Sequence, residues 1–246
     1  GESGVGAAIL AEKMGANVFV SDAGVLKDAY RSELHSLNVD YEESGHDLDR
    51  ILKADLVVKS PGIPNTVEVL QKLRSSGVLI FSEIEFAAQY TEAKKICITG
   101  SNGKTTTTML LYHIFKSAGL EVCFAGNVGK SLARQVATSE PEFFIIELSS
   151  FQLDDLKDFR ADISILLNIT PDHLDRYDNN LSLYADSKMR ITNNQKTSDW
   201  LIYNADDPII SEKILKLHLP MQMASFSIKS AQELGGYSIS DQLIIN

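Results

Sequence analysis

Cysteine and long apolar runs are both scarce in this sequence. It has only two cysteines, Cys97 and Cys123, and both lie in apolar, strand-like stretches. We interpret them as buried core residues in a reducing compartment, which argues against a disulfide or a cysteine metal site. No apolar run approaches the length of a membrane span, and no signal peptide is visible. We therefore expect a cytoplasmic protein that does not enter a membrane.

Basic residues are also few. The sequence has 23 Lys and Arg against 33 Asp and Glu, which gives a formal net charge of -10. Such a charge repels polyphosphate backbones, so we do not expect nucleic-acid binding. An anionic nucleotide would need hydrogen-bond donors placed locally, at one site, to overcome this repulsion.

The 246 residues alternate short apolar runs with helical patterns. This alternation is typical of α/β folds with largely parallel sheets. The polar stretch YTEAKK is our candidate linker, so we expect two domains: a Rossmann-like domain at 1–93 and a P-loop-type mononucleotide-binding α/β domain at 94–246. In the second domain we expect strands at 96–99, 121–125, 143–148, 162–168 and 200–203, helices at 104–118, 130–137, 181–193 and 207–217, and a final hairpin.

A G-x-x-G-K-T turn follows the strand at 96–99 and opens the next helix. It consists of Gly100, Gly103, Lys104 and Thr105 with two residues between the glycines. The backbone N–H groups of such a turn and the helix N-terminus attract phosphate. Lys104 can reach phosphate oxygens, and the Thr105 hydroxyl can ligate Mg²⁺. A full Walker A loop is two residues longer, so a glycine-rich turn without a ligand stays an alternative.

An acidic partner for a metal ion occurs in FFIIELSSFQLD, where a buried-strand pattern ends in Glu147. Parallel sheets place their ligands at the carboxyl ends of the strands, and a carboxylate there can hold Mg²⁺ against phosphates. The alternative is an ordinary strand-end residue in solvent. Together the turn and Glu147 favour one metal–phosphate site.

The stretch NITPDHLDRY, residues 168–177, also follows a strand. Thr170 and Pro171 are typical of a helix start, with Thr170 as the N-cap. This interpretation does not explain His173, because an imidazole gains little at a helix N-terminus. Since imidazole is a less common Mg²⁺ ligand than oxygen, the spacing leaves a metal role for His173 open.

Several motifs in order make the sequence similar to the Mur ligase family, the ATP-dependent amide ligases of peptidoglycan precursor synthesis. The motifs are TGSNGKTTT, GNVG, ELSSFQL, NITPDHLDRY, YADSKMRI and YNADD, all between residues 99 and 207. The short phosphate loop is the family's own form. ELSSFQL resembles the branch that adds D-glutamate to UDP-N-acetylmuramoyl-L-alanine through an acyl phosphate. A sibling ligase for another amino acid and a non-catalytic nucleotide-binding module are the alternatives.

The resemblance implies roles for individual residues. Lys104 and Thr105 would hold the ATP phosphates and, with Glu147, the first of two Mg²⁺ ions. His173 and Lys188 would hold the second Mg²⁺, with Lys188 converted to a carbamate; without the family, Lys188 has the pattern of a helix-surface lysine. The residues implied to bind ATP are Gly100, Ser101, Asn102, Gly103, Lys104, Thr105 and Thr106.

The first third resembles the family's UDP-binding domain. Its opening glycines look like the remnant of a dinucleotide-binding turn, and Asp22 follows about twenty residues on, as a ribose- or base-contacting acid would. Alone, this turn could also suggest NAD. A basic residue that some relatives carry two positions after the acid is Gly24 here. The residues implied to contact the UDP-sugar are Glu2, Ser3, Asp22, Ser60, Gly62, Asn127 and Ser149.

The resemblance also sets limits. We find no counterpart of the family's C-terminal ligase domain, which closes over ATP and binds the incoming amino acid, and no strand before the first glycine turn. We therefore expect a fragment, truncated at both ends, that turns over poorly by itself and is a monomer.

Overall fold

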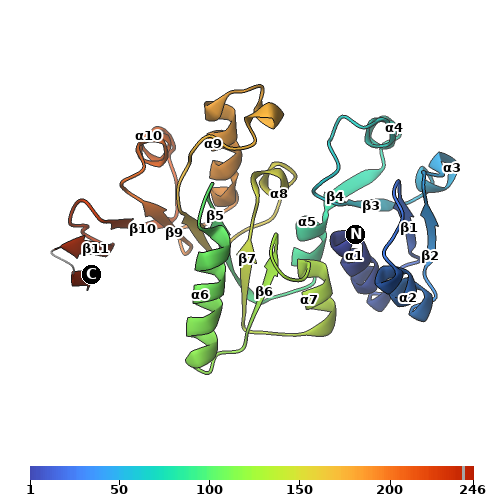
Figure 1. Cartoon of the computed structure of the whole chain (residues 1–246), viewed down its shortest axis with the longest axis horizontal. Coiled ribbons are helices and arrows are strands. Elements are labelled where there is room, and N and C mark those ends of the chain that lie inside the picture. The colour runs from blue at the N-terminus through green and yellow to red at the C-terminus, as the bar shows by residue number, and fades with distance from the viewer. Residues whose placement is uncertain (240–241) are drawn as a thin grey trace. The chain divides into compact units, whose positions relative to one another are not determined.

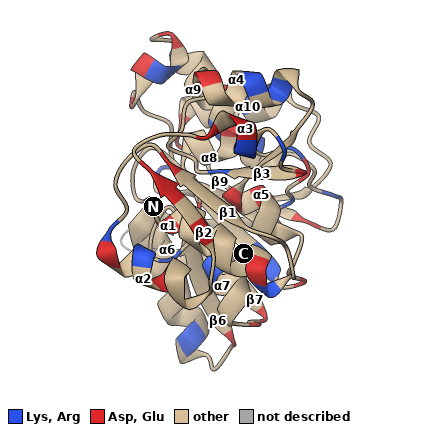
Figure 2. Cartoon of the chain, turned by 90° about the vertical axis from the view of Figure 1, so that its right-hand side faces the viewer, with Lys and Arg blue, Asp and Glu red and all other residues tan. Residues whose placement is uncertain are grey.

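The computed structural model describes residues 1–239 and 242–246. The chain forms two compact units. Unit 1 consists of Gly1–Glu92 and Val128–Glu140, and unit 2 consists of Ala93–Asn127 and Pro141–Asn246. Both units alternate strands with helices, which confirms the predicted α/β class (Figure 1). Lys and Arg are dispersed among Asp and Glu over the elements of both units (Figure 2). None of the described helices is long and apolar enough to cross a membrane.

Unit 1 contains two separate pairs of parallel strands, β1 with β2 and β3 with β4. The sequence does not predict β2, because its residues DYEE offer no apolar alternation to signal a strand. Small apolar clusters around Leu34 and around Leu73 hold the helices of this unit to the two pairs. The elements are α1 (Glu2–Lys13), β1 (Phe19–Asp22), α2 (Asp28–Ser36), β2 (Asp40–Glu43), α3 (Leu48–Ile51), β3 (Leu56–Lys59), α4 (Glu68–Ser75), β4 (Leu79–Ser82), α5 (Glu83–Ala88) and α7 (Leu132–Thr138).

Helix α7 lies between two strands of unit 2 in the sequence but packs against α1 and α5 of unit 1. We expected this helix in the second domain. Its Arg134 is only 9% exposed and forms ion pairs with Glu2 at 2.7 Å and Glu33 at 2.9 Å. The backbone N–H of Ala133 donates to the buried Glu83 carboxylate at 2.5 Å. Burial, and to a smaller extent the negative charge of Glu2, raise the pKa of Glu83 to about 7.

Unit 2 is built on an eight-stranded sheet in the order β12-β11-β10-β9-β8-β5-β7-β6, antiparallel only between β11 and β12. The residues joining these last two strands lie outside the described residues. The elements are β5 (Lys94–Thr99), α6 (Lys104–Ser117), β6 (Val122–Gly126), β7 (Phe143–Glu147), α8 (Ser150–Asp154), β8 (Ile163–Leu166), η1 (Leu174–Tyr177), α9 (Leu181–Met189), η2 (Arg190–Thr192), β9 (Trp200–Asn204), α10 (Pro208–Lys216), β10 (Gln222–Ser227), β11 (Gly235–Ile239) and β12 (Gln242–Ile245).

The helix after the phosphate loop, α6, packs on the strands at the middle of this sheet. Its Leu111 and Phe115 contact a core of buried isoleucines that includes Ile98 and Ile145. The helix begins after Gly103, whose φ of 83° is the left-handed conformation that glycine adopts without strain. Threonine is a poor helix former, and the threonine-rich first turn is helical because the packing of Leu111 and Phe115 outweighs this local propensity.

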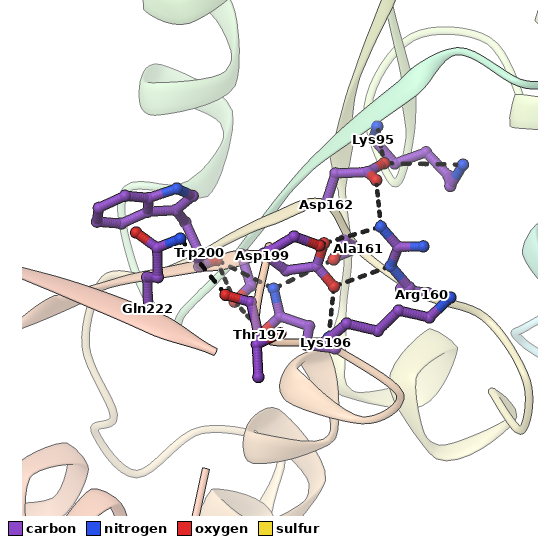
Figure 3. A network of polar contacts seen from close by, with 12 residues as sticks. Lys95, Arg160, Ala161, Asp162, Lys196, Thr197, Asp199, Trp200 and Gln222 are labelled. Atoms are coloured by element: carbon purple, nitrogen blue, oxygen red, sulfur yellow. Dashed lines mark hydrogen bonds and ion pairs between the residues drawn. The ribbon is translucent and has the colours of Figure 1, made fainter. Parts of the chain in front are cut away.

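A polar network closes the amino end of the sheet (Figure 3). Arg160 donates two hydrogen bonds of 2.8 Å to the carboxylate of Asp199, which is 2% exposed, and a third of 2.9 Å to Asp162. Asp162 also accepts from the backbone N–H of Lys95 in β5. The network therefore fixes the starts of β5, β8 and β9 relative to one another.

Candidate functional site

The phosphate loop, residues 100–103, leaves the carboxyl end of β5, which lies between β7 and β8. Two lysines converge on it. Lys104 Nζ donates to the carbonyl oxygens of Gly100 at 2.9 Å and Ser101 at 3.0 Å. Lys188 Nζ, from α9, donates to the same Gly100 oxygen at 2.9 Å. Lys104, predicted to bind phosphate, and Lys188, predicted to become a metal ligand, therefore share one acceptor.

Lys188 is not a surface residue. Its side chain is 1% exposed, so the interpretation from the local pattern alone is wrong and burial follows from the packing of α9. Burial, and to a smaller extent the charge of Lys104, lower the pKa of Lys188 to about 7. Its amine is therefore partly neutral, and hence nucleophilic, at physiological pH.

Glu147 ends β7 and is 1% exposed. Its Oε2 accepts from the Thr105 hydroxyl at 2.8 Å, and its Oε1 accepts from the Asn127 amide at 2.8 Å. Gly126 lets the end of β6 lie close to the end of β7, because a Cβ there would lie 2.2 Å from the backbone carbonyl oxygen of Glu147. The carboxylate is thus fixed from two neighbouring elements and lies beside the first turn of α6.

The segment 168–170 hydrogen-bonds along the phosphate loop. Thr170 does not begin a helix as expected, and the short helix η1 starts only after His173. Instead the backbone N–H and carbonyl oxygen of Thr170 both bond to the Ser101 hydroxyl, each at 2.9 Å. Tertiary hydrogen bonds have here replaced the N-cap role that the local sequence favours.

His173 follows on the same segment. Its side chain is 59% exposed, its backbone φ is 49°, and its ring lies 5.4 Å from the ring of Phe151. Arg176 covers Phe151 at 4.4 Å. Since Phe151 belongs to α8, directly after Glu147 and Ser149, the motifs ELSSFQL and NITPDHLDRY contact each other.

The donors of this site suit Mg²⁺ bound together with phosphate better than a cage made by protein alone. Within the described part of the chain, no three His, Cys, Asp or Glu side chains lie close enough to hold a metal ion. The joined hydroxyl of Thr105 and carboxylate of Glu147 are hard oxygen donors. Mg²⁺ prefers one or two such protein ligands and takes the rest from substrate phosphates and water.

The residues expected to contact a UDP-sugar have varied surroundings. Ser149 caps α8 and exchanges hydrogen bonds with Gln152 in a capping box. In unit 1, the Glu2 carboxylate binds Arg134 and the backbone N–H of Ser131, which directs it toward α7. Ser3 and Gly4 lie in the first turn of α1, and the Ser60 hydroxyl lies 3.7 Å from the position that a Cβ on Gly4 would take. Asp22 Oδ1 accepts from the backbone N–H of Gly24 at 2.9 Å, and Gly62 is exposed in the turn after β3.

The Mur ligase middle domain matches residues 98–242, and the MurD N-terminal domain matches residues 7–69. The chain belongs to the Mur ligase family.

Two curated Mur ligases illustrate the similarity. The UDP-N-acetylmuramoylalanine–D-glutamate ligase of Bacteroides thetaiotaomicron is 56% identical over 92% of this chain and 51% of its own length. The enzyme of that name from Christiangramia forsetii is 45% identical over 100% of this chain and 55% of its own length. The chain therefore spans about half the length of the curated relatives it matches.

The fold is also found among solved Mur ligases. The crystal structure of UDP-N-acetylmuramate:L-alanyl-gamma-D-glutamyl-meso-diaminopimelate ligase from Neisseria meningitides matches 95% of this chain and 78% of its own, with a TM-score of 0.65. At 20% sequence identity this match supports the shared fold alone.

Proposed function

We propose that this chain is part of a UDP-N-acetylmuramoyl-L-alanine:D-glutamate ligase that acts as a monomer in the cytoplasm. The reaction would join D-glutamate to the UDP-sugar at the expense of ATP, in peptidoglycan precursor synthesis. The observation that carries this proposal is the junction of Lys104, Lys188 and the Thr105–Glu147 pair at the phosphate loop. The names of the most similar relatives support the choice of amino acid.

ATP would place its phosphates on the loop. The backbone N–H groups of residues 100–106 and the N-terminus of α6 would receive them, and Lys104 would exchange its carbonyl acceptors for phosphate oxygens. Thr105 and Glu147 would hold one Mg²⁺ there. When bound, Mg²⁺ supplies positive charge that offsets the repulsion between the phosphates and an attacking carboxylate.

A second Mg²⁺ would lie beside His173 and Lys188. For this, the neutral Nζ of Lys188 would attack the carbon of CO₂, form an N–C bond and release one proton. The product is an anionic carbamate, which can ligate a cation where an ammonium group would repel it. The pKa of about 7 favours this step because it leaves the amine partly neutral at physiological pH.

The chemistry would take two displacements. An oxygen of the L-alanine carboxylate attacks the γ-phosphorus of ATP and ADP leaves. The amine of D-glutamate then attacks the acyl carbon, phosphate leaves, and the amine loses its proton. Lys104 would stabilise charge on the transferring phosphoryl group. Asn127 and Ser149 would contact the muramoyl part, and Glu2, Ser3, Asp22, Ser60 and Gly62 the UDP part.

The test is a calorimetric titration of the full 246-residue chain with UDP-N-acetylmuramoyl-L-alanine and with the same sugar nucleotide lacking alanine. We expect clear preference for the alanylated form. Equal binding of both would point to a sibling ligase. Binding of ATP without either sugar nucleotide would point to a nucleotide-binding module and contradict the proposal.

A further inference from the structure

We propose that Asn168 is a positioning residue that holds the phosphate loop in its binding conformation. Its Oδ1 accepts from the backbone N–H of Asn102 at 2.8 Å, and its Nδ2 donates to the carbonyl oxygen of the same residue at 3.0 Å. One side-chain amide thus pairs with both backbone groups of one loop residue, as a neighbouring β-strand would. The inference rests on the proposed function only in that the loop binds phosphate.

The rest of the short loop is tied to the same segment. The Ser101 N–H donates to the Asn168 carbonyl oxygen at 2.9 Å, and the Asn102 side chain donates to the Thr170 hydroxyl at 3.1 Å. With the two bonds between Ser101 and Thr170 already described, both residues between the loop glycines are held by 168–170. The local sequence pattern predicts a helix start at this segment, and it gives no sign of these hydrogen bonds.

The segment is itself anchored, so it can hold the loop rather than move with it. The N–H of Ile169 donates to Asp207 Oδ2 at 2.8 Å. The other oxygen of Asp207 caps α10 by accepting from Ile209 and Ile210. Asn204 donates to the Leu167 carbonyl oxygen at 3.0 Å. Two residues of the motif YNADD therefore fix the backbone on both sides of Asn168.

Such support matters because the loop binds an anion through the direction of its N–H groups. Glycine gives the loop access to many backbone conformations, and only some of them point these groups together. A loop fixed before binding loses less conformational entropy when phosphate arrives. Removing the Asn168 bonds should therefore weaken phosphate binding without unfolding unit 2.

The experiment compares the full chain with Asn168→Ala and with Asn194→Ala as a matched control. Asn194 also uses its amide to tie a loop, donating to the carbonyl oxygens of Lys157 and Phe159, but this loop precedes β8. Two readouts are needed: hydrogen exchange of residues 99–106 in the free chain, and calorimetric affinity for ATP with Mg²⁺. We expect faster exchange and about tenfold weaker ATP binding for Asn168→Ala alone, the effect of losing one to two hydrogen bonds. Unchanged exchange in the loop would overturn the inference.

If Asn168→Ala is unstable, a second pair of variants tests whether the segment 168–170 holds the loop. Thr170→Val and Asn102→Ala remove opposite ends of one hydrogen bond, so their effects on loop exchange should be less than additive in the double variant. Additive effects would show that the hydrogen bond between Asn102 and Thr170 does not hold the loop. Hydrogen exchange also separates the two proposals. If the parent chain fails to bind ATP, the proposed function is contradicted. The exchange measurement uses the free chain, so it still decides the role of Asn168.

Discussion

Lys104 and Lys188 donate hydrogen bonds to one and the same oxygen, the carbonyl of Gly100, each at 2.9 Å. Two ammonium groups on one acceptor repel each other, and the more buried one, Lys188, loses its proton more easily. Burial and the charge of Lys104 lower the pKa of Lys188 to about 7. The relationship links Lys104 to the proton affinity of Lys188, a residue far away in the sequence.

The first prediction concerns this link. Lys104→Met should raise the pKa of Lys188, because the variant keeps much of the side-chain volume and removes the neighbouring charge. NMR titration of ¹³C-labelled lysine side chains measures the shift. Lys116→Met, at an exposed position of the same helix, is the control and should leave the Lys188 signal unchanged. An unshifted Lys188 in the Lys104 variant would mean that burial alone sets its pKa.

The second prediction concerns the carbamate. At pH 8, a pKa of about 7 leaves roughly nine-tenths of Lys188 neutral, whereas an ordinary lysine would be neutral in well under one-hundredth of molecules. Chain equilibrated with ¹³C-bicarbonate should therefore show one carbamate carbon signal at pH 8 that fades toward pH 6. Lys188→Met should lack the signal. A parent chain without it at any pH would remove Lys188 from the proposed metal ligands.

The third prediction concerns Glu83 and pH. Its pKa rises from 4.5 to about 7 on folding, so between these values the folded state holds a proton that the unfolded state has lost. The associated stability is fully present below pH 4.5 and is lost as the pH rises through 7. Glu83→Gln removes this dependence while keeping an acceptor for α7. The free energy of unfolding of Glu83→Gln minus that of the parent should therefore be up to about 3 kcal/mol larger at pH 8 than at pH 5.

Urea unfolding at the two pH values measures the effect of Glu83→Gln. The control, Glu12→Gln, changes an exposed carboxylate on α1. It should change the free energy of unfolding by the same amount at pH 5 and at pH 8. If Glu83→Gln also shows no difference between pH 5 and pH 8, the Glu83 carboxylate titrates alike in the folded and unfolded chain.

The fourth prediction concerns the network at the amino end of the sheet. Arg160→Ala removes both charge-assisted hydrogen bonds that the guanidinium donates to the buried Asp199 carboxylate, and we expect a loss of about 2 kcal/mol in the free energy of unfolding. Lys216→Ala breaks only an exposed pair with Glu212 and should cost less than about 0.5 kcal/mol. Equal losses in urea unfolding would show that the Arg160 network adds nothing beyond a surface ion pair.

The sequence predicted those parts of the molecule that local chemistry determines. The strand before Gly100 and helix α6 were found because an apolar run, a glycine turn and a helical pattern follow one another. Glu147 was found because a buried strand pattern ends in it. Lys188 shows the limit: its helix has ordinary spacing, and only the packing of α9 beneath the phosphate loop makes it buried. Without the family motifs it would have been missed.

Thr170 and Asn168 show a second limit. Thr170 has every local property of an N-cap, yet its backbone and hydroxyl bond to a loop some seventy residues earlier in the chain. Asn168 carried no signal of its own, because an amide that mimics a strand partner is recognisable only beside that partner. Helix α7 was predicted as a helix, but its ion pairs with unit 1 depend on the tertiary placement of Glu2 and Glu33.

Helix α7 also has a consequence for how the chain is made. Because Val128–Glu140 belongs to unit 1, the backbone passes between the units three times, after residues 92, 127 and 140. On the ribosome, the first ninety residues emerge without the helix that pairs with Glu2 and covers Glu83. They must wait for β5, α6 and β6 to be synthesised before their own unit is complete. A nascent chain halted before residue 132 should therefore be far more open to proteases than one halted a few dozen residues later.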